Sequence, residues 1–110
     1  MKIILDHNVP KRLRGALPDH AVKTAKEMGW AELENGDLLR AAEADSFDLM
    51  ITCDQNLSYQ QNMTKRQIAL VVLDTNNWNV LQRNFRAIVE AVDGAVRGGF
   101  RFLEIRRRSS

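Results

Sequence analysis

Three short apolar runs, each followed by an aspartate, limit what this chain can fold into. The runs and their aspartates are Lys2–Leu5 with Asp6, Phe47–Thr52 with Asp54, and Ile68–Leu73 with Asp74. Runs of this length, rich in β-branched residues, are typical of strands that are buried on both faces. The stretches between them are long enough for crossover connections, which predicts a mainly parallel sheet.

Helical spacing and turn residues supply the other expected elements. We expect helices at about Val9–Leu17, within Ala25–Gly36, at Asp37–Ala44 and at Asn79–Val96, a loop with a helical turn at Gln55–Gln61, a marginal strand at His20–Thr24, and an edge strand from Phe100 to about Ile105. This order predicts a three-layer α/β/α fold with roughly five strands. It forms a single domain over residues 1–105, followed by a basic, disordered tail at 106–110.

Length and cysteine content narrow the class of protein. A chain of 110 residues has room for one small domain, and its single cysteine, Cys53, excludes a disulfide framework and a Cys-rich metal site. A reducing cytoplasm is the expected compartment. The longest unbroken apolar run, Ile68–Leu73, is far shorter than the roughly 20 residues of a membrane span, and we expect no signal peptide.

The net charge of +2 conceals a strong segregation along the chain. Residues 1–26 carry six Lys/Arg and two Asp/Glu, residues 27–54 carry one and eight, and residues 55–110 carry nine and four. These counts correspond to charges of +4, −7 and +5. An acidic centre between basic arms suits a cation site beside a polyanion-binding surface, although many soluble domains show similar asymmetry.

The aspartates that follow the strands are candidates for a metal site. The carboxyl ends of parallel strands form the ligand crevice of an open α/β sheet, and Asp37, which starts a helix before the second apolar run, is expected on the same rim. Several like carboxylates need a positive partner, and oxygen ligands suit Mg²⁺ or Mn²⁺. Helix capping by Asp6 and Asp54, a helix-dipole role for Asp37 and a turn at Asp74 are the structural alternatives.

Three segments together resemble the small PIN-like nucleases. LDHNVP after the opening strand, ENGDLLRAAEA and DLMITCDQN look like the branch that begins with an LDENLP-type motif and carries a TxD-type motif in mid-chain. The resemblance covers about residues 2–74. It implies a metal-dependent ribonuclease, in many members the toxin of a toxin-antitoxin pair, with Asp6, Asp37 and Asp54 as catalytic and metal-binding residues.

Two positions depart from this pattern. His7 replaces the acid that often follows the first aspartate, and Asn56 replaces the acid expected two residues after Asp54. The site therefore has up to two fewer negative charges than the pattern of the family. His7 is a weaker candidate for a phosphate contact, Asn8 and Asn56 for orienting ligands or water, and Asp74 for the edge of the site.

Basic and aromatic residues suggest how RNA would be bound. The candidates for contacts to backbone phosphates are Lys11, Arg12, Arg14, Lys65 and Arg66. Trp30 or Tyr59 could stack a base, with core packing as the alternative. Single-stranded RNA is the substrate that the resemblance implies, an antitoxin protein is an expected partner, and Trp78 beside a long apolar helix suggests a homodimer.

Two other functions compete with metal-dependent hydrolysis. A receiver-type signalling domain would use Asp54 as phospho-acceptor, but it needs a second acid at His7 and a lysine at the end of the last strand, where Glu104 to Arg106 stand. A PIN-like domain that no longer cleaves, and only binds RNA or a protein, is the stronger rival.

Overall fold

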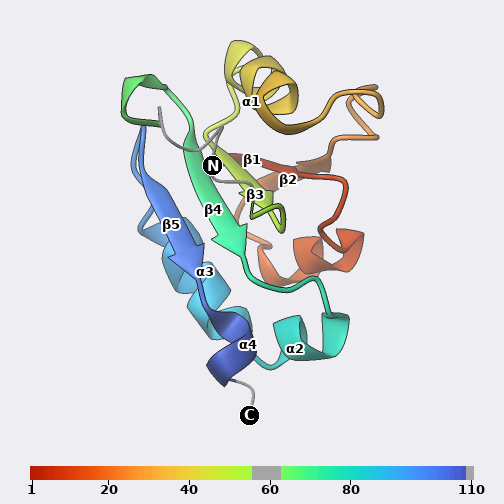
Figure 1. Cartoon of the computed structure of the whole chain (residues 1–110), viewed down its shortest axis with the longest axis vertical. Coiled ribbons are helices and arrows are strands. Elements are labelled where there is room, and N and C mark those ends of the chain that lie inside the picture. The colour runs from red at the N-terminus through yellow and green to blue at the C-terminus, as the bar shows by residue number, and fades with distance from the viewer. Residues whose placement is uncertain (56–62, 109–110) are drawn as a thin grey trace.

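The protein is built on a five-stranded sheet in which all neighbouring strands are parallel (Figure 1). The computed structural model describes residues 1–55 and 63–108. Its strands are β1 (Lys2–Leu5), β2 (Ala21–Thr24), β3 (Leu49–Thr52), β4 (Ala69–Leu73) and β5 (Phe100–Leu103), and they lie in the order β2-β1-β3-β4-β5. The predicted parallel sheet is confirmed.

The burial of each strand follows its place in the sheet. All residues of β3 and β4 are buried, whereas the edge strands β2 and β5 expose two of their four residues each. Continuous apolar runs therefore identified the central strands, because a strand covered on both faces has no polar side.

Helices cover both faces of the sheet and complete the predicted three-layer α/β/α fold. The helical elements are the 3₁₀ helices η1 (Lys11–Ala16) and η2 (Met63–Lys65), and the α-helices α1 (Asn35–Ala44), α2 (Trp78–Gln82), α3 (Phe85–Asp93) and α4 (Ile105–Arg108). One core lies between the sheet and η1, α2 and α3, and a second lies between the sheet and α1 and η2. Within the described residues, no helix has the length and apolarity needed to cross a membrane.

The strand order reverses direction between β1 and β3. From β1 the chain moves outward to β2 on one side, and from β3 it moves outward through β4 to β5 on the other. In open parallel sheets the crevice beyond the carboxyl ends of two such strands is the usual place for a ligand. The topology therefore points to the segments that follow β1 and β3.

Several helices differ from the expected ones. The helix expected at Val9–Leu17 is the shorter 3₁₀ helix η1, and residues 25–34 form turns instead of a short helix. The long helix expected at Asn79–Val96 is divided into α2 and α3. The amide of Asn84 donates to the Val80 carbonyl (2.8 Å), which ends α2 because that side chain takes a carbonyl of its last turn.

The first three residues of the tail that we expected to be disordered, 106–108, are part of a helix. Ile105 and Arg106 donate their backbone N–H groups to Asp74 Oδ1 at 3.0 and 3.1 Å, so the carboxylate satisfies the first donors of α4. The Arg106 guanidinium also donates to the Asp74 carbonyl (3.0 Å). Residues 106–108 therefore belong to α4, which lies beyond the tip of β5 in Figure 1. Residues 109 and 110 lie outside the described part of the chain.

Candidate functional site

The residues that follow β1 and β3 lie side by side at the point where the strand order reverses. Leu5 pairs with Ile51 in the parallel register, and the Asp6 N–H donates to the Ile51 carbonyl at 3.0 Å. This continuation of the ladder places Asp6 next to Thr52, the last residue of β3. Asp54 follows two residues later.

Thr52 joins the two aspartates. Its Oγ1 donates to Asp6 Oδ2 at 2.6 Å and accepts from the Asp54 N–H at 2.9 Å. Asp6 Oδ1 accepts from the backbone N–H of His7 at 2.7 Å. Asp6 is only 6% exposed and Thr52 is fully buried, so these hydrogen bonds hold a carboxylate in the interior without an ion pair to any described residue.

Cys53 connects the segment after β1 with the segment after β4 at the same edge of the sheet. Its N–H donates to Asn8 Oδ1 at 3.0 Å, and its thiol donates to the Thr75 carbonyl at 3.3 Å. Burial raises the pKa of the Cys53 thiol to about 12, and the negative charges of Asp6 and Asp74 add to that rise. Both carboxylates therefore lie close enough to the thiol to disfavour its ionised form.

Asp37 does not join these groups, and it has an ion-pair partner of its own. It lies in the first turn of α1, is 65% exposed at its side chain, and forms an ion pair with Arg40. In the described part of the chain, no group of three or more His, Cys, Asp and Glu residues could hold a metal ion. A site of three gathered carboxylates is therefore not formed, and metal binding stays a prediction.

The donor set still suits one kind of cation. Mg²⁺ is commonly bound through one or two carboxylates, with waters and substrate phosphates completing its shell. Asp6 and Asp54 are the carboxylates that follow β1 and β3, and Asp6 forms no ion pair with a cationic side chain of the described residues. The residues present fit a Mg²⁺ or Mn²⁺ ion that shares its shell with substrate, and they do not fit an all-protein cage.

The weaker site candidates have structural partners. His7 Nε2 lies 2.6 Å from the Leu33 carbonyl, and because a carbonyl only accepts, this nitrogen is the donor. Asn8 ties the loop after β1 to the loop after β3, as an orienting residue would. Asp74 caps α4 instead of opening a turn, and Asn56 lies outside the described residues.

The basic candidates divide into two groups. Lys11, Arg12 and Arg14 belong to η1, which follows Asp6. Arg12 stacks on the Trp78 ring at 4.6 Å, and Arg14 pairs with Glu27 at 2.5 Å, which leaves Lys11 as the exposed, unpaired cation of η1 among the described residues.

Lys65 and Arg66, the other two predicted phosphate contacts, lie at the opposite end of the strands from Asp6 and Asp54. They come just before β4 begins, and Arg66 pairs with Glu43 at 3.2 Å, near the end of α1. Trp30 packs edge-on against Phe47 at 5.9 Å, so core packing accounts for it. Tyr59 lies outside the described residues.

Sequence reasoning missed two features of this region. Thr52 was visible only as part of the TxD-type motif, and its bridging role depends on the register between β1 and β3. The second is a pocket of about 310 Å³ beside Asp6, whose far wall is the turn after β2. The signal for that turn was the Thr24-x-x-Glu27 spacing of a capping box.

Comparison with protein-family models, with curated proteins and with solved structures gave no match. The resemblance to PIN-like nucleases therefore stays a prediction that depends on the three motifs.

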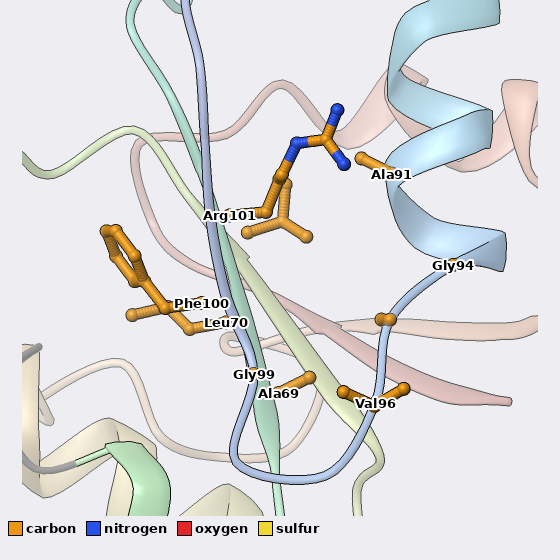
Figure 2. A pocket seen from close by; sticks show the side chains of 10 residues that line it. Ala69, Leu70, Ala91, Gly94, Val96, Gly99, Phe100 and Arg101 are labelled. Atoms are coloured by element: carbon orange, nitrogen blue, oxygen red, sulfur yellow. The ribbon is translucent and has the colours of Figure 1, made fainter.

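A second pocket, of about 180 Å³, lies at the amino ends of β4 and β5 (Figure 2). In Figure 2, Arg101 projects toward α3 near Ala91, whereas Phe100 points to the other face of the sheet. Arg101 is the only ionisable residue among those that line this pocket. Without a carboxylate, histidine or hydroxyl side chain, it offers no group for acid-base or metal chemistry.

Proposed function

We propose that this protein is a metal-dependent ribonuclease that cleaves phosphodiester bonds in single-stranded RNA. The observation that supports it best is the buried Asp6 carboxylate, bonded to Thr52 and adjacent to Asp54 where the strand order reverses. A buried acid without a cationic partner at a sheet's ligand crevice is more typical of a site than of a cap.

The chain's own residues have distinct parts in this chemistry. Asp6 and Asp54 would hold the ion, and when bound, Mg²⁺ or Mn²⁺ supplies Lewis acidity for attack of water on the phosphodiester. Thr52 fixes the Asp6 carboxylate, and Asn8 fixes the loop after β3 relative to the loop after β1. Lys11 would contact the phosphate backbone. A role as the toxin of a toxin-antitoxin pair, a homodimeric state and a cytoplasmic location belong to the same proposal.

Cleavage of a labelled single strand with Mg²⁺, with Mn²⁺ and with EDTA tests this function. We expect cleavage only with metal, and its loss in Asp6→Asn and Asp54→Asn. Asp19→Asn is the matched control, because it removes one charge from an exposed residue outside the site. Cleavage that persists in EDTA, or that survives both site variants, would overturn the proposal.

A binding-only domain is the second candidate, and Asp37 favours it. Asp37 is paired with Arg40, and both oxygens of Asp6 already accept hydrogen bonds. Such a domain would bind RNA or a partner protein without cleaving. RNA binding that is unchanged by EDTA, together with no cleavage in any metal, would favour this candidate.

A further inference from the structure

The pocket beside Asp6 opens above the carboxyl ends of β1 and β2 and has a volume of about 310 Å³. One wall is the segment that leaves β1, and the other is the turn that leaves β2. The residues that line it are Leu5, Asp6, His7, Val9, Lys11, Thr24, Ala25 and Lys26. Its size lies at the lower end of the range for small-ligand sites.

Two sets of polar contacts build the wall after β2 and join it to η1. Thr24 and Glu27 form a capping box, in which Glu27 Oε1 accepts from the Thr24 N–H (2.8 Å) and Thr24 Oγ1 accepts from the Glu27 N–H (3.1 Å). Arg14 of η1 donates to the same Glu27 oxygen at 2.5 Å. The ion pair between Arg14 and Glu27 therefore ties the two walls together, and neither of these two residues lines the pocket.

The two lysines that line the pocket are not part of the Arg14–Glu27 ion pair. Lys11 on one wall and Lys26 on the other are exposed, and the side-chain ammonium group of neither forms an ion pair or hydrogen bond with any residue that the structure describes. Arg14 is paired with Glu27 and Arg12 stacks on Trp78, and neither arginine lines the pocket, so Lys11 and Lys26 are the pocket's cations among the described residues.

Part of the pocket lining is apolar, beside the polar side chains of Asp6, His7 and Thr24. Leu5, Val9 and Ala25 contribute it, and they are almost fully buried because they also belong to the two cores. A bare phosphate would leave this surface without a partner. A ligand that combines a phosphate with a flat, weakly polar ring would use both the lysines and the apolar lining.

We propose that this pocket binds one nucleotide of the RNA strand, with its phosphate between Lys11 and Lys26 and its base against the apolar lining. Because Asp6 borders the pocket, the neighbouring phosphodiester would be delivered to the edge where Asp6 and Asp54 lie. The choice of RNA as ligand rests on the proposed function, whereas the pocket itself does not require a metal ion.

A metal-free titration tests the pocket apart from catalysis. In EDTA, adenosine 5′-monophosphate, adenosine and inorganic phosphate are each added while the amide NMR signals of His7, Thr24 and Lys26 are followed. We expect the monophosphate to shift these signals at the lowest concentration. Lys26→Gln should weaken its binding about fivefold, the size expected for one exposed charge-assisted contact.

Lys65→Gln is the matched control, since it removes the same charge from an exposed lysine at the opposite edge of the sheet. It should leave binding unchanged. With a single-stranded oligonucleotide, Lys26→Gln should also lower the slope of log K against log salt by about 0.7, and the control should not. Melting temperatures of both variants verify that each is folded.

Three results would overturn this inference. Inorganic phosphate that binds as tightly as the monophosphate would leave an anion site only, and adenosine that binds as tightly would remove the phosphate contact. Equal losses in Lys26→Gln and Lys65→Gln would indicate nonspecific attraction. Nucleotide binding without metal-dependent cleavage would overturn the proposed hydrolysis alone, and cleavage without binding here would overturn the pocket alone.

Discussion

Thr52 determines how the Asp6 carboxylate is held, since its hydroxyl supplies one of the two hydrogen bonds to that buried acid. Thr52→Val keeps the shape but removes this donor. We expect it to lower the free energy of unfolding by about 1–3 kcal/mol, the usual cost of leaving a buried polar group without a partner. Thr52→Ser retains the hydroxyl and should cost less. Urea unfolding of the three proteins measures both values, and equal losses in the two variants would contradict this role.

Cys53 offers a chemical readout of the charge on Asp6. The pKa of its thiol is raised to about 12, whereas an unfolded thiol has a pKa of about 8.5. At pH 8.5 the thiol should therefore react with iodoacetamide far more slowly in the native protein than in urea. Asp6→Asn removes one cause of the rise and should shift the alkylation profile to lower pH. Burial, the largest cause, should keep the profile above that of the unfolded chain.

The matched control for this measurement is Asp19→Asn, an exposed acid that does not contribute to the rise. An alkylation profile that is the same in Asp6→Asn and wild type would show that the Asp6 charge does not reach the thiol.

At the residue scale, position after a strand predicted Asp6 and Asp54 correctly as neighbours at one edge, because parallel strands bring their carboxyl ends together. Lys65 and Arg66 were named as phosphate contacts from their charge alone, and because they precede a strand they lie at the other end of the strands. Arg12 could not have been assigned from sequence, because Trp78 stacks on it from a distant part of the chain.

At the scale of elements, the ion pair between η1 and the turn after β2 should make stability depend on pH. The Thr24 N–H, and then Arg14, lower the pKa of Glu27 below its ordinary value of 4.5. A carboxyl group with a lowered pKa stabilises the fold above its unfolded pKa, and this stabilisation is lost as the pH falls through the folded pKa.

Glu27→Gln preserves an acceptor for the capping box but removes the charge. We expect wild type to melt above this variant at pH 7, and the difference to close as the pH falls below 4.5. Glu90→Gln is the control, because its pair with Arg86 is 3.7 Å long and highly exposed. A difference for Glu27→Gln that is constant from pH 7 to pH 3 would contradict the assignment.

Strands were easier to predict than helices in this chain, for a physical reason. Each central strand is a continuous apolar run, so its identity depends on its own residues. The division between α2 and α3 depends instead on the Asn84 side chain, and the helical form of residues 106–108 depends on Asp74 in another element. Periodicity carries no information about such contacts.

At the scale of the whole molecule, folding brings cations of the two basic arms into ion pairs with acids of the central segment. Lys2 pairs with Asp45, Arg14 with Glu27, and Arg66 with Glu43, each joining an arm to the segment 27–54. These three ion pairs compensate part of the charge segregation within the fold. The edge that holds Asp6 and Asp54 is the expected place for a cation.

Metal binding at that edge should be visible as stability of the entire domain. An ion that binds only the folded state adds RT ln(1 + [L]/Kd), about 2.7 kcal/mol at a hundredfold excess over Kd, so millimolar Mn²⁺ should raise the melting temperature by several degrees. Asp54→Asn should abolish the rise. Asp37→Asn should retain it, because Asp37 is paired with Arg40. Loss of the rise in Asp37→Asn would return that residue to the site, whereas no rise in wild type would favour the binding-only domain.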